Sequence, residues 1–442
     1  MANGNEASTL SLVYQPDERP RSLRDTLLYS LQWLFIMFYP VVWGYAVVGT
    51  GLGFDGPELG NYMSRVVLMV GITTIVQVVC GHRFAMVSGP NIIPSLAVVA
   101  AAAVGGREYA LLSFNAYIIA GIVVALLGLT GIFSRLSRVW TPLVQGAMVM
   151  MVGLTTSSTG MSMIAGEAAG WPFLAGIMLA LVCGWLSLRG KTLLATVPVM
   201  VTIVLGYLVF ILSGRFDWSI VRAMPAFTLP ELFPYGMQVP PLDLIITMVI
   251  VNLFSALNLY GNVHAYADIV RHPVSPKTER RCFSIFGLLE GSLAGILGVP
   301  SYVAYGENLG FILLTRVASR TFILIAAAGL ILVSFFGPVS GLMSAMPEPV
   351  AGAVLLGVAS TLIGLGASTW AKSGRFGERE IFIGGFSVFF ALGTSLLPPA
   401  FFDSLPRLVS TLLKNPVILV IGLVMLLEQV IFRQTEEPGE AG

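Results

Sequence analysis

A carboxylate and an amide interrupt an otherwise apolar stretch in the second half of the chain. Glu307 and Asn308 follow Gly306, after a run from Ser301 to Tyr305 rich in aromatic and β-branched residues, a composition typical of a short strand. A carboxylate here can accept hydrogen bonds from N–H groups of a ligand, and an ionisable group inside a membrane is functional by default. The alternative is that Glu307 only caps a helix and pairs with nearby donors. We favour binding because the charge coincides with a break in the apolar pattern.

The apolar run that follows, from Leu309 to Leu314, is far shorter than the roughly 20 residues that a helix needs to cross a bilayer. Non-helical backbone at membrane depth is tolerated only where it is buried in protein or lines a cavity. The pattern therefore predicts a broken helix at a binding site, an arrangement used by secondary transporters.

A second break of the same kind occurs earlier in the chain. The motif Gly-x-Asn followed by an aliphatic residue begins at Gly89 and again at Gly306, 217 residues later, and the same offset carries Trp43-Gly44-Tyr45 onto Tyr260-Gly261-Asn262. Chance recurrence in a Gly-rich membrane chain is the alternative to an internal repeat. Seven segments per repeat is an odd number, so the second copy enters the membrane from the opposite side. We predict that the two extended runs pair antiparallel, with two half-helix N-termini facing one polar ligand.

Composition places the chain in a membrane. Of its 442 residues 56% are hydrophobic and 11% charged, whereas soluble domains carry about 25% charged residues. A net charge of +1 gives no basic face for a nucleic acid. We predict an all-α polytopic membrane protein with fourteen transmembrane segments in two inverted seven-helix repeats, of which the third and tenth segments are broken and carry short β-strands. The segments are 27–49, 62–80, 84–103, 109–133, 140–161, 171–188, 192–213, 241–263, 282–299, 302–318, 321–341, 344–366, 381–400 and 408–432.

Lys and Arg predict the orientation. With the N-terminus inside, eighteen of the 24 basic residues fall in cytoplasmic connections or tails and six fall outside, a strong positive-inside bias. Both tails, 1–26 and 433–442, are therefore predicted to be cytoplasmic, and the polar N-terminal stretch is not a cleavable signal peptide. His82, His264 and His272 all fall in predicted cytoplasmic loops.

Further polar side chains inside the segments are candidates for binding or proton transfer. Glu290 in the ninth segment either carries a transported proton or is a protonated structural group. Asn258 and Asn262 lie four residues apart on one face of the eighth segment, where amides contact a ligand or bond to another helix.

Aromatic side chains and backbone N–H groups complete the predicted site. Tyr305 and Trp33 are candidates to stack on a planar ligand, and the alternative is that they pack in the core. Backbone N–H groups near Asn91, Ile92 and Gly306 are expected to meet ligand carbonyls. The predicted substrate-binding residues are Glu307, Asn258, Asn262, Gly306, Tyr305, Asn308, Asn91, Ile92 and Trp33, and those predicted for proton coupling are Glu307 and Glu290.

Several kinds of chemistry are not supported by the sequence. It contains no Gly-x4-Gly-Lys-Ser/Thr nucleotide loop, so ATP is not expected to drive the protein directly. Cys80, Cys183 and Cys282 stand singly in apolar surroundings without metal-ligand spacing. No Ser/His/Asp arrangement is evident, so we predict a protein that is not an enzyme and that needs neither cofactor nor metal.

At the second break the chain resembles the nucleobase/ascorbate transporter family, also called the xanthine/uracil permeases or nucleobase:cation symporter-2. The signature of that family is Gln/Glu/Pro-Asn-x-Gly, then four residues, then Thr and one of Arg, Lys or Gly. Here Glu307-Asn308-Leu309-Gly310 and Thr315-Arg316 match it in full. The resemblance extends to Leu31-Gln32, Gly81-His82-Arg83 and Met346-Pro347-Glu348-Pro349-Val350.

The resemblance implies a core of segments one to four and eight to eleven that moves as an elevator against a gate of the remaining segments. In this chain we place the core at 27–134 and 240–320 and the gate at 135–239 and 321–432. The resemblance further implies a homodimer in the bacterial inner (plasma) membrane that imports a small nucleobase-like substrate with H+ or Na+.

The departures from the family pattern lie in the site itself. Trp33 stands where the family commonly has His after Gln, and Asn258 matches a base-binding Glu of bacterial members. Asn262 matches a His that uracil members use in proton coupling, and Ile92 matches a ring-contacting Phe. These differences put both the usual substrate and the usual proton relay in question.

The leading prediction is a secondary active symporter for a nucleobase or similar planar N-heterocycle of the uracil, xanthine or urate class, coupled to protons. The alternative is a sulfate-type anion exchanger or channel with the same seven-plus-seven architecture. Glu307 opposes the alternative, because a carboxylate beside a half-helix N-terminus offsets the positive potential that an anion needs.

Overall fold

The computed structural model describes residues 11–166, 170–188, 198–371 and 377–433. The outer parts of the two predicted tails, and the predicted cytoplasmic connections at 189–191 and 372–376, lie outside these ranges. In the first half of the chain the helical elements are α1 (Leu23–Trp43), η1 (Gly44–Gly49), α2 (Gly56–Val79), α3 (Ile92–Thr130), α4 (Phe133–Leu136), η2 (Ser137–Val139), α5 (Pro142–Ala165), α6 (Trp171–Leu188), α7 (Pro198–Leu212) and α8 (Trp218–Ala223).

The second half of the chain is also mostly helical. Across both halves, η1, η4 and η5 are π-helical segments. Its helical elements are α9 (Leu242–Val270), α10 (Pro276–Ile285), η4 (Phe286–Leu293), α11 (Ala294–Ile296), α12 (Asn308–Thr315), α13 (Arg320–Ser334), α14 (Gly337–Ser344), α15 (Glu348–Ala371), α16 (Glu378–Ser395), α17 (Pro399–Asp403), α18 (Arg407–Leu413), α19 (Pro416–Leu426) and η5 (Leu427–Ile431).

Seven of the described helices are long and apolar enough to cross a membrane, or eight if the pair formed by α18 and the helix after it, bent by 89°, is one span. Two shorter apolar helices, α7 and α13, add to these. Inside α3, Gly106 has φ 80° and ψ 178°, so the helix is interrupted between the predicted third and fourth segments. The chain is therefore a mostly helical membrane protein, and the count of fourteen spans stays a prediction.

Two short strands lie side by side inside the helical bundle. β1 (Ser88–Pro90) pairs antiparallel with β2 (Tyr302–Ala304), with Gly89 opposite Val303. Backbone hydrogen bonds extend the pairing on both sides, from Asn91 N–H to the Ser301 carbonyl (2.8 Å) and from Tyr305 N–H to the Val87 carbonyl (3.1 Å). The antiparallel pairing expected from the sequence is confirmed. Each strand satisfies the polar backbone of the other, which a lipid environment cannot do.

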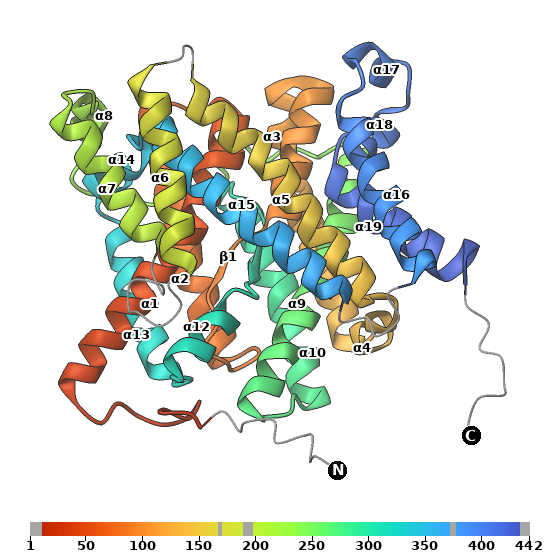
Figure 1. Ribbon diagram of the computed structural model, residues 1–442, viewed down its shortest axis with the longest axis horizontal. Helices are drawn as coiled ribbons and strands as arrows, with labels where there is room; N and C mark the ends of the chain where they lie inside the picture. The colour runs from red at the N-terminus through yellow and green to blue at the C-terminus, as the bar shows by residue number, and fades with distance from the viewer. Residues whose placement is uncertain (1–10, 167–169, 189–197, 372–376, 434–442) are drawn as a thin grey trace.

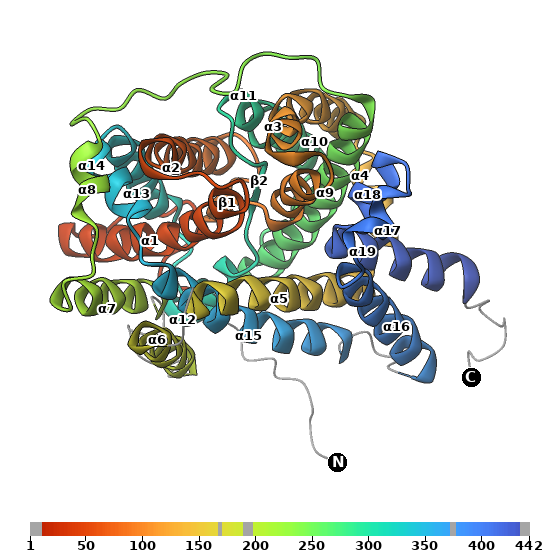
Figure 2. The ribbon, with the colours of Figure 1, turned by 90° about the horizontal axis from the view of Figure 1, so that it is seen from above.

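The helices form a bundle around the strand pair and a second layer beside it. α3 packs against α9 and η4, and α13 packs against α2 and α1. Figure 2 shows α5 and α15 side by side along one side of this bundle, with α6 against them. The two helices of this layer approach closely because both are rich in glycine: a Cβ on Gly352 would lie 2.5 Å from the Gly160 carbonyl oxygen.

One loop prediction was wrong. His264 lies inside α9, which continues to Val270, past the predicted end at 263, and its ring stacks on Tyr260 with centroids 3.9 Å apart. The last turns of α9 carry polar residues, so they were not included in the predicted segment. Hydropathy marks where the apolar pattern stops, and the helix continues beyond that point.

Candidate functional site

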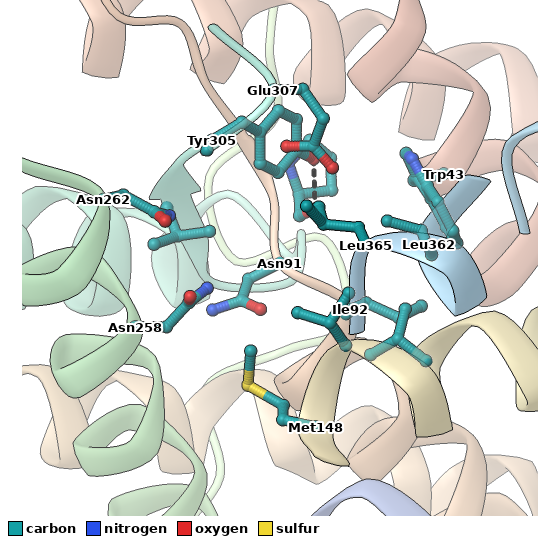
Figure 3. Close-up of a pocket in the computed structure, with 15 residues that line it drawn as sticks. Trp43, Asn91, Ile92, Met148, Asn258, Asn262, Tyr305, Glu307, Leu362 and Leu365 are labelled. Atoms are coloured by element: carbon teal, nitrogen blue, oxygen red, sulfur yellow. Dashed lines mark hydrogen bonds between the residues drawn. The ribbon is translucent and has the colours of Figure 1, made fainter. Parts of the chain in front are cut away.

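A hollow of about 690 Å3 lies beside the strand pair, where the starts of α3 and α12 meet α9, α5 and α15. Figure 3 shows the side chains around it. The lining residues are Trp43, Pro90, Asn91, Ile92, Met148, Val149, Val152, Asn258, Asn262, Val303, Tyr305, Gly306, Glu307, Leu362 and Leu365. Seven of the nine residues predicted to bind substrate are thus brought together around one cavity.

Glu307 stands directly before α12 and is exposed to the hollow. It makes no side-chain cap to the helix, and its carboxylate has no hydrogen bond or ion pair to any other described residue. The capping role that was the alternative is therefore not what this side chain does. The N–H groups and the dipole at the start of α12 favour a negative charge at this position, and the acceptor oxygens remain available to a ligand.

Asn91 occupies the corresponding position at the start of α3, but it is engaged differently. Its Oδ1 accepts a hydrogen bond from Ile93 N–H (3.1 Å), so the side chain caps the helix. Its Nδ2 is buried and has no partner among the described residues. Figure 3 shows the amide directed toward Asn258 across the hollow. Asn91 therefore offers a hydrogen-bond donor that only a ligand or water can satisfy.

The two asparagines of α9 divide their roles. Asn258 lines the hollow, and its amide makes no hydrogen bond within the described part of the chain. Asn262, one turn further on, donates from Nδ2 to the Ala304 carbonyl of β2 (2.9 Å). Its Oδ1 lies 2.9 Å from where a Cβ on Gly306 would be, so only glycine fits beside it without a shift. Asn258 is thus free for a ligand, whereas Asn262 holds the strand.

Tyr305 and Asn308 tie the two broken segments together. The Tyr305 hydroxyl donates to the Pro90 carbonyl (2.5 Å), a bond drawn in Figure 3, and its ring forms one side of the hollow. Asn308 Nδ2 donates to the carbonyls of Tyr305 (2.7 Å) and Val87 (3.3 Å). Asn308 is buried in these backbone contacts and does not line the hollow.

Two other predicted residues also lie away from the hollow. Trp33 is fully buried against Phe311, with ring centroids 4.5 Å apart, so it packs α1 on α12 and does not line the cavity. Glu290 is buried in η4, where one carboxylate oxygen accepts a hydrogen bond from Gln77 Nε2 (2.7 Å) and the other has no partner among described residues. Glu290 therefore belongs to a separate polar cluster.

The wall opposite the strands is apolar, and the sequence did not indicate it. Met148 and Val152 come from α5, and Leu362 and Leu365 from α15. Nothing distinguishes these side chains in sequence, because helices that are apolar on every face give no sign of which face meets a cavity. Trp43 also lines the hollow, and its match to Tyr260 in the predicted repeat was the signal available for it.

A second hollow of about 990 Å3 adjoins the first, between α12 on one side and α6, α7 and α15 on the other. Tyr305 and Glu307 line both hollows, and Asn308 lines the second. The Glu307 carboxylate therefore stands at the boundary between two cavities.

Comparison with known proteins gives one consistent result for the family. A family model described as the Permease family matches residues 24–400. The uric acid permease PucK of Bacillus subtilis is 24% identical over 423 residues, covering 94% of this chain and 97% of the relative. The xanthine permease XanP of Escherichia coli is 26% identical over 419 residues, covering 88% of each chain.

Among solved structures, murine Slc26a9, an anion transporter captured in the inward-facing state, resembles this chain with a TM-score of 0.62. The likeness covers 94% of this chain and 69% of that one at 12% sequence identity. At this identity the likeness concerns the fold alone.

Proposed function

The chain belongs to the permease family of xanthine and uracil carriers, and from this premise we propose that it is a secondary active transporter that imports a nucleobase of the uracil, xanthine or urate class. Membership makes it a transporter of the membrane and not an enzyme. The choice of substrate rests on the site and on the names of the relatives.

One observation carries the proposal: among the described residues the Glu307 carboxylate has no partner, and it lines the same hollow as Asn91, whose Nδ2 is unpaired, and Asn258, whose amide makes no hydrogen bond. The edge of a xanthine or uracil ring alternates N–H donors with carbonyl acceptors. We assign the ring N–H groups to Glu307 and the carbonyls to Asn91 Nδ2 and the Asn258 amide.

The apolar wall suits the faces of a flat ring. Tyr305 lies on the strand side, and Met148, Leu362 and Leu365 lie on the α5 and α15 side. A planar base between them would bury both faces against apolar atoms while its edge meets the polar groups. Gly306, Ile92 and Asn262 complete the proposed site as spacers and strand contacts.

We further propose that transport follows an elevator movement of the strand-bearing core against the layer of α5, α6, α7, α15, α16 and α19. This assignment includes fourteen spans in two inverted repeats and cytoplasmic termini. α13 packs on α1 and α2, which supports placing the second core segment at 240–334 instead of ending it at residue 320. The coupling ion is proposed to be H+, with Na+ as the alternative, and the assembly a homodimer in the bacterial plasma membrane.

The sulfate-type alternative draws on the fold likeness to an anion transporter. The site disfavours it, because Glu307 places a negative group where an anion would have to approach the start of α12.

Uptake by the purified protein in proteoliposomes tests the proposal. We expect saturable accumulation of radiolabelled xanthine, urate or uracil, driven by an imposed inward pH gradient and abolished by a protonophore, with no uptake of labelled sulfate. Sulfate transport without any nucleobase uptake would overturn it. Accumulation that follows a Na+ gradient in the presence of the protonophore would keep the substrate class and change the coupling ion.

A further inference from the structure

We propose that the protein binds a phosphate-like oxyanion in a third hollow, separate from the two hollows that Glu307 lines, at the edge where α10 begins. This hollow, about 720 Å3, is formed by the N-terminal segment at Pro16 and Asp17, the loop 82–84 before β1, the connection 272–275 before α10, and Arg320 at the start of α13. Figure 1 places the start of α10 at the lower edge of the bundle.

A buried histidine supplies the first observation. His82 is 1% exposed and lines this hollow. Its Nδ1 accepts a hydrogen bond from Phe84 N–H (3.0 Å), so Nδ1 carries no proton and the neutral ring carries its proton on Nε2. Burial lowers the pKa of His82 to about 3, so the ring stays neutral. Nε2 is therefore a hydrogen-bond donor, and it has no acceptor among the described residues.

The start of α10 supplies the second observation. Ser275 caps this ten-residue helix by accepting from Thr278 N–H (3.2 Å), and Pro276 occupies the first helical position. The helix N-terminus carries partial positive charge, which favours anions. Ser275 and Thr278 both line the hollow, and their hydroxyl groups are hydrogen-bonded to each other (2.9 Å).

The charges around the hollow sum to a positive value. Arg83 is exposed and forms no ion pair within the described ranges, whereas Arg320 is paired with Asp17, the acidic residue of the lining. One guanidinium is thus left over, and His272 also lines the hollow. A neutral buried donor, an unpaired guanidinium, hydroxyl groups and a helix N-terminus together suit a tetrahedral oxyanion with several acceptor oxygens.

Such an anion would join segments that support the substrate site. The loop 82–84 leads into β1, and the segment from Arg316 to Arg320 follows α12. The N-terminal segment is already bound to that second loop, through Val13 N–H to the Arg316 carbonyl (2.8 Å) and Ala318 N–H to the Tyr14 carbonyl (2.9 Å). The oxyanion has two possible sources with the same chemistry, free phosphate and the headgroup of an anionic lipid.

Thermal stability of the purified protein against inorganic phosphate, at constant ionic strength with chloride as reference, tests the site. We expect saturable stabilisation of the wild type, with a dissociation constant at least tenfold weaker in Arg83→Gln. Arg271→Gln is the matched control, because Arg271 is also an exposed arginine with a left-handed backbone (φ 53°, against 66° for Arg83) but does not line the hollow. No saturable stabilisation, or an equal loss in both variants, would overturn the proposal.

Imidazole 15N NMR gives an independent readout, because the chain has only three histidines. Phosphate should shift the Nε2 signal of His82 in the wild type, with a much smaller shift in Arg83→Gln; no change at His82 would contradict the site. Repeating the titration in nanodiscs of phosphatidylcholine with and without phosphatidylglycerol identifies the source. If phosphatidylglycerol removes the phosphate response, the site holds a lipid headgroup, and if the response persists, it holds free phosphate. Neither readout depends on transport of a nucleobase.

Discussion

The starts of α3 and α12 each follow one strand of the central pair, but the residues before the two helices differ in whether their side chains cap the helix. At α3 the side chain of Asn91 caps the helix and keeps one buried donor toward the hollow. At α12 the carboxylate of Glu307 makes no cap and is exposed to the hollow. The Asn91 side chain therefore bonds to its own helix, whereas the Glu307 carboxylate stays available to the proposed ligand.

This difference shows how two similar strand-to-helix segments can produce an asymmetric site. The strand pair fixes both helix starts at the same place, so the backbone contribution of the two halves is similar. The side chains at the two helix starts then decide what the proposed ligand would meet there: acceptor oxygens from Glu307 and a donor from Asn91. A ligand with N–H groups on one edge and a carbonyl on the next fits such a pair.

The largest effect is expected for Glu307→Gln, which removes the uncapped charge. A hydrogen bond to a charged group contributes about 1.5 to 3 kcal/mol, so the loss of one or two such bonds should weaken nucleobase binding by roughly 100-fold. The midpoint of thermal unfolding should change little, because the carboxylate has no partner among the described residues. Radioligand binding and thermal unfolding measure the two quantities. Glu231→Gln, an exposed carboxylate of the loop before α9, is the control; unchanged binding in Glu307→Gln would refute the assignment.

Asn91 should separate capping from binding. Asn91→Asp keeps a cap oxygen and loses the Nδ2 donor, so we expect about tenfold weaker binding, equivalent to about 1.4 kcal/mol, with unfolding stability retained. Asn91→Ala loses both, and its free energy of unfolding should fall by a further amount of about 1 kcal/mol. Binding assays on both variants, with denaturation midpoints alongside, measure this. Equal stability of the two variants would mean that the cap contributes nothing.

Tyr305→Phe tests the tie between the two segments. The variant keeps the aromatic ring at the hollow and removes the hydrogen bond to the Pro90 carbonyl. A neutral hydrogen bond is worth about 1 kcal/mol, so stability should fall by about that much and affinity by a few-fold. Hydrogen exchange at the amides of the strand pair should increase. Unchanged exchange with a large loss of affinity would instead make the hydroxyl a direct ligand contact.

The smallest effect on affinity is expected for Glu290→Gln. Glu290 lies in the cluster with Gln77 and does not line the hollow, so nucleobase binding should change by less than about twofold, or under 0.4 kcal/mol. If Glu290 carries the transported proton, the variant should still exchange substrate across the membrane but should not accumulate it against a gradient. Counterflow and gradient-driven uptake in the same proteoliposomes distinguish these activities. Full proton-driven accumulation would exclude Glu290 from coupling.

Much of the polar half of the site follows from the sequence. The breaks at Gly89 and Gly306 predicted strand pairing and led to Glu307, Asn91 and Asn258, because polar groups inside apolar segments stand out. The roles of Asn308 and Trp33 did not follow, since the same amide or ring can face a cavity or its own backbone, and spacing does not decide between them.

The apolar half of the site could not be predicted. α5 and α15 are apolar on almost every side, so the faces carrying Met148 and Leu362 give no sequence signal until the packing is known. The attachment of the N-terminal segment to the loop after α12 was missed for a different reason, because it is made through backbone groups.

The strand pair also has a consequence for dividing the gene. β1 comes from the N-terminal half and β2 from the C-terminal half. A polypeptide ending before residue 240 would therefore leave backbone N–H and C=O groups of β1 unpaired inside the membrane. The complementary fragment would have the same defect at β2. The two fragments should be unstable when produced alone and should rescue one another when synthesised together in one cell. Fragment complementation would then report directly on formation of the central pairing in living membranes.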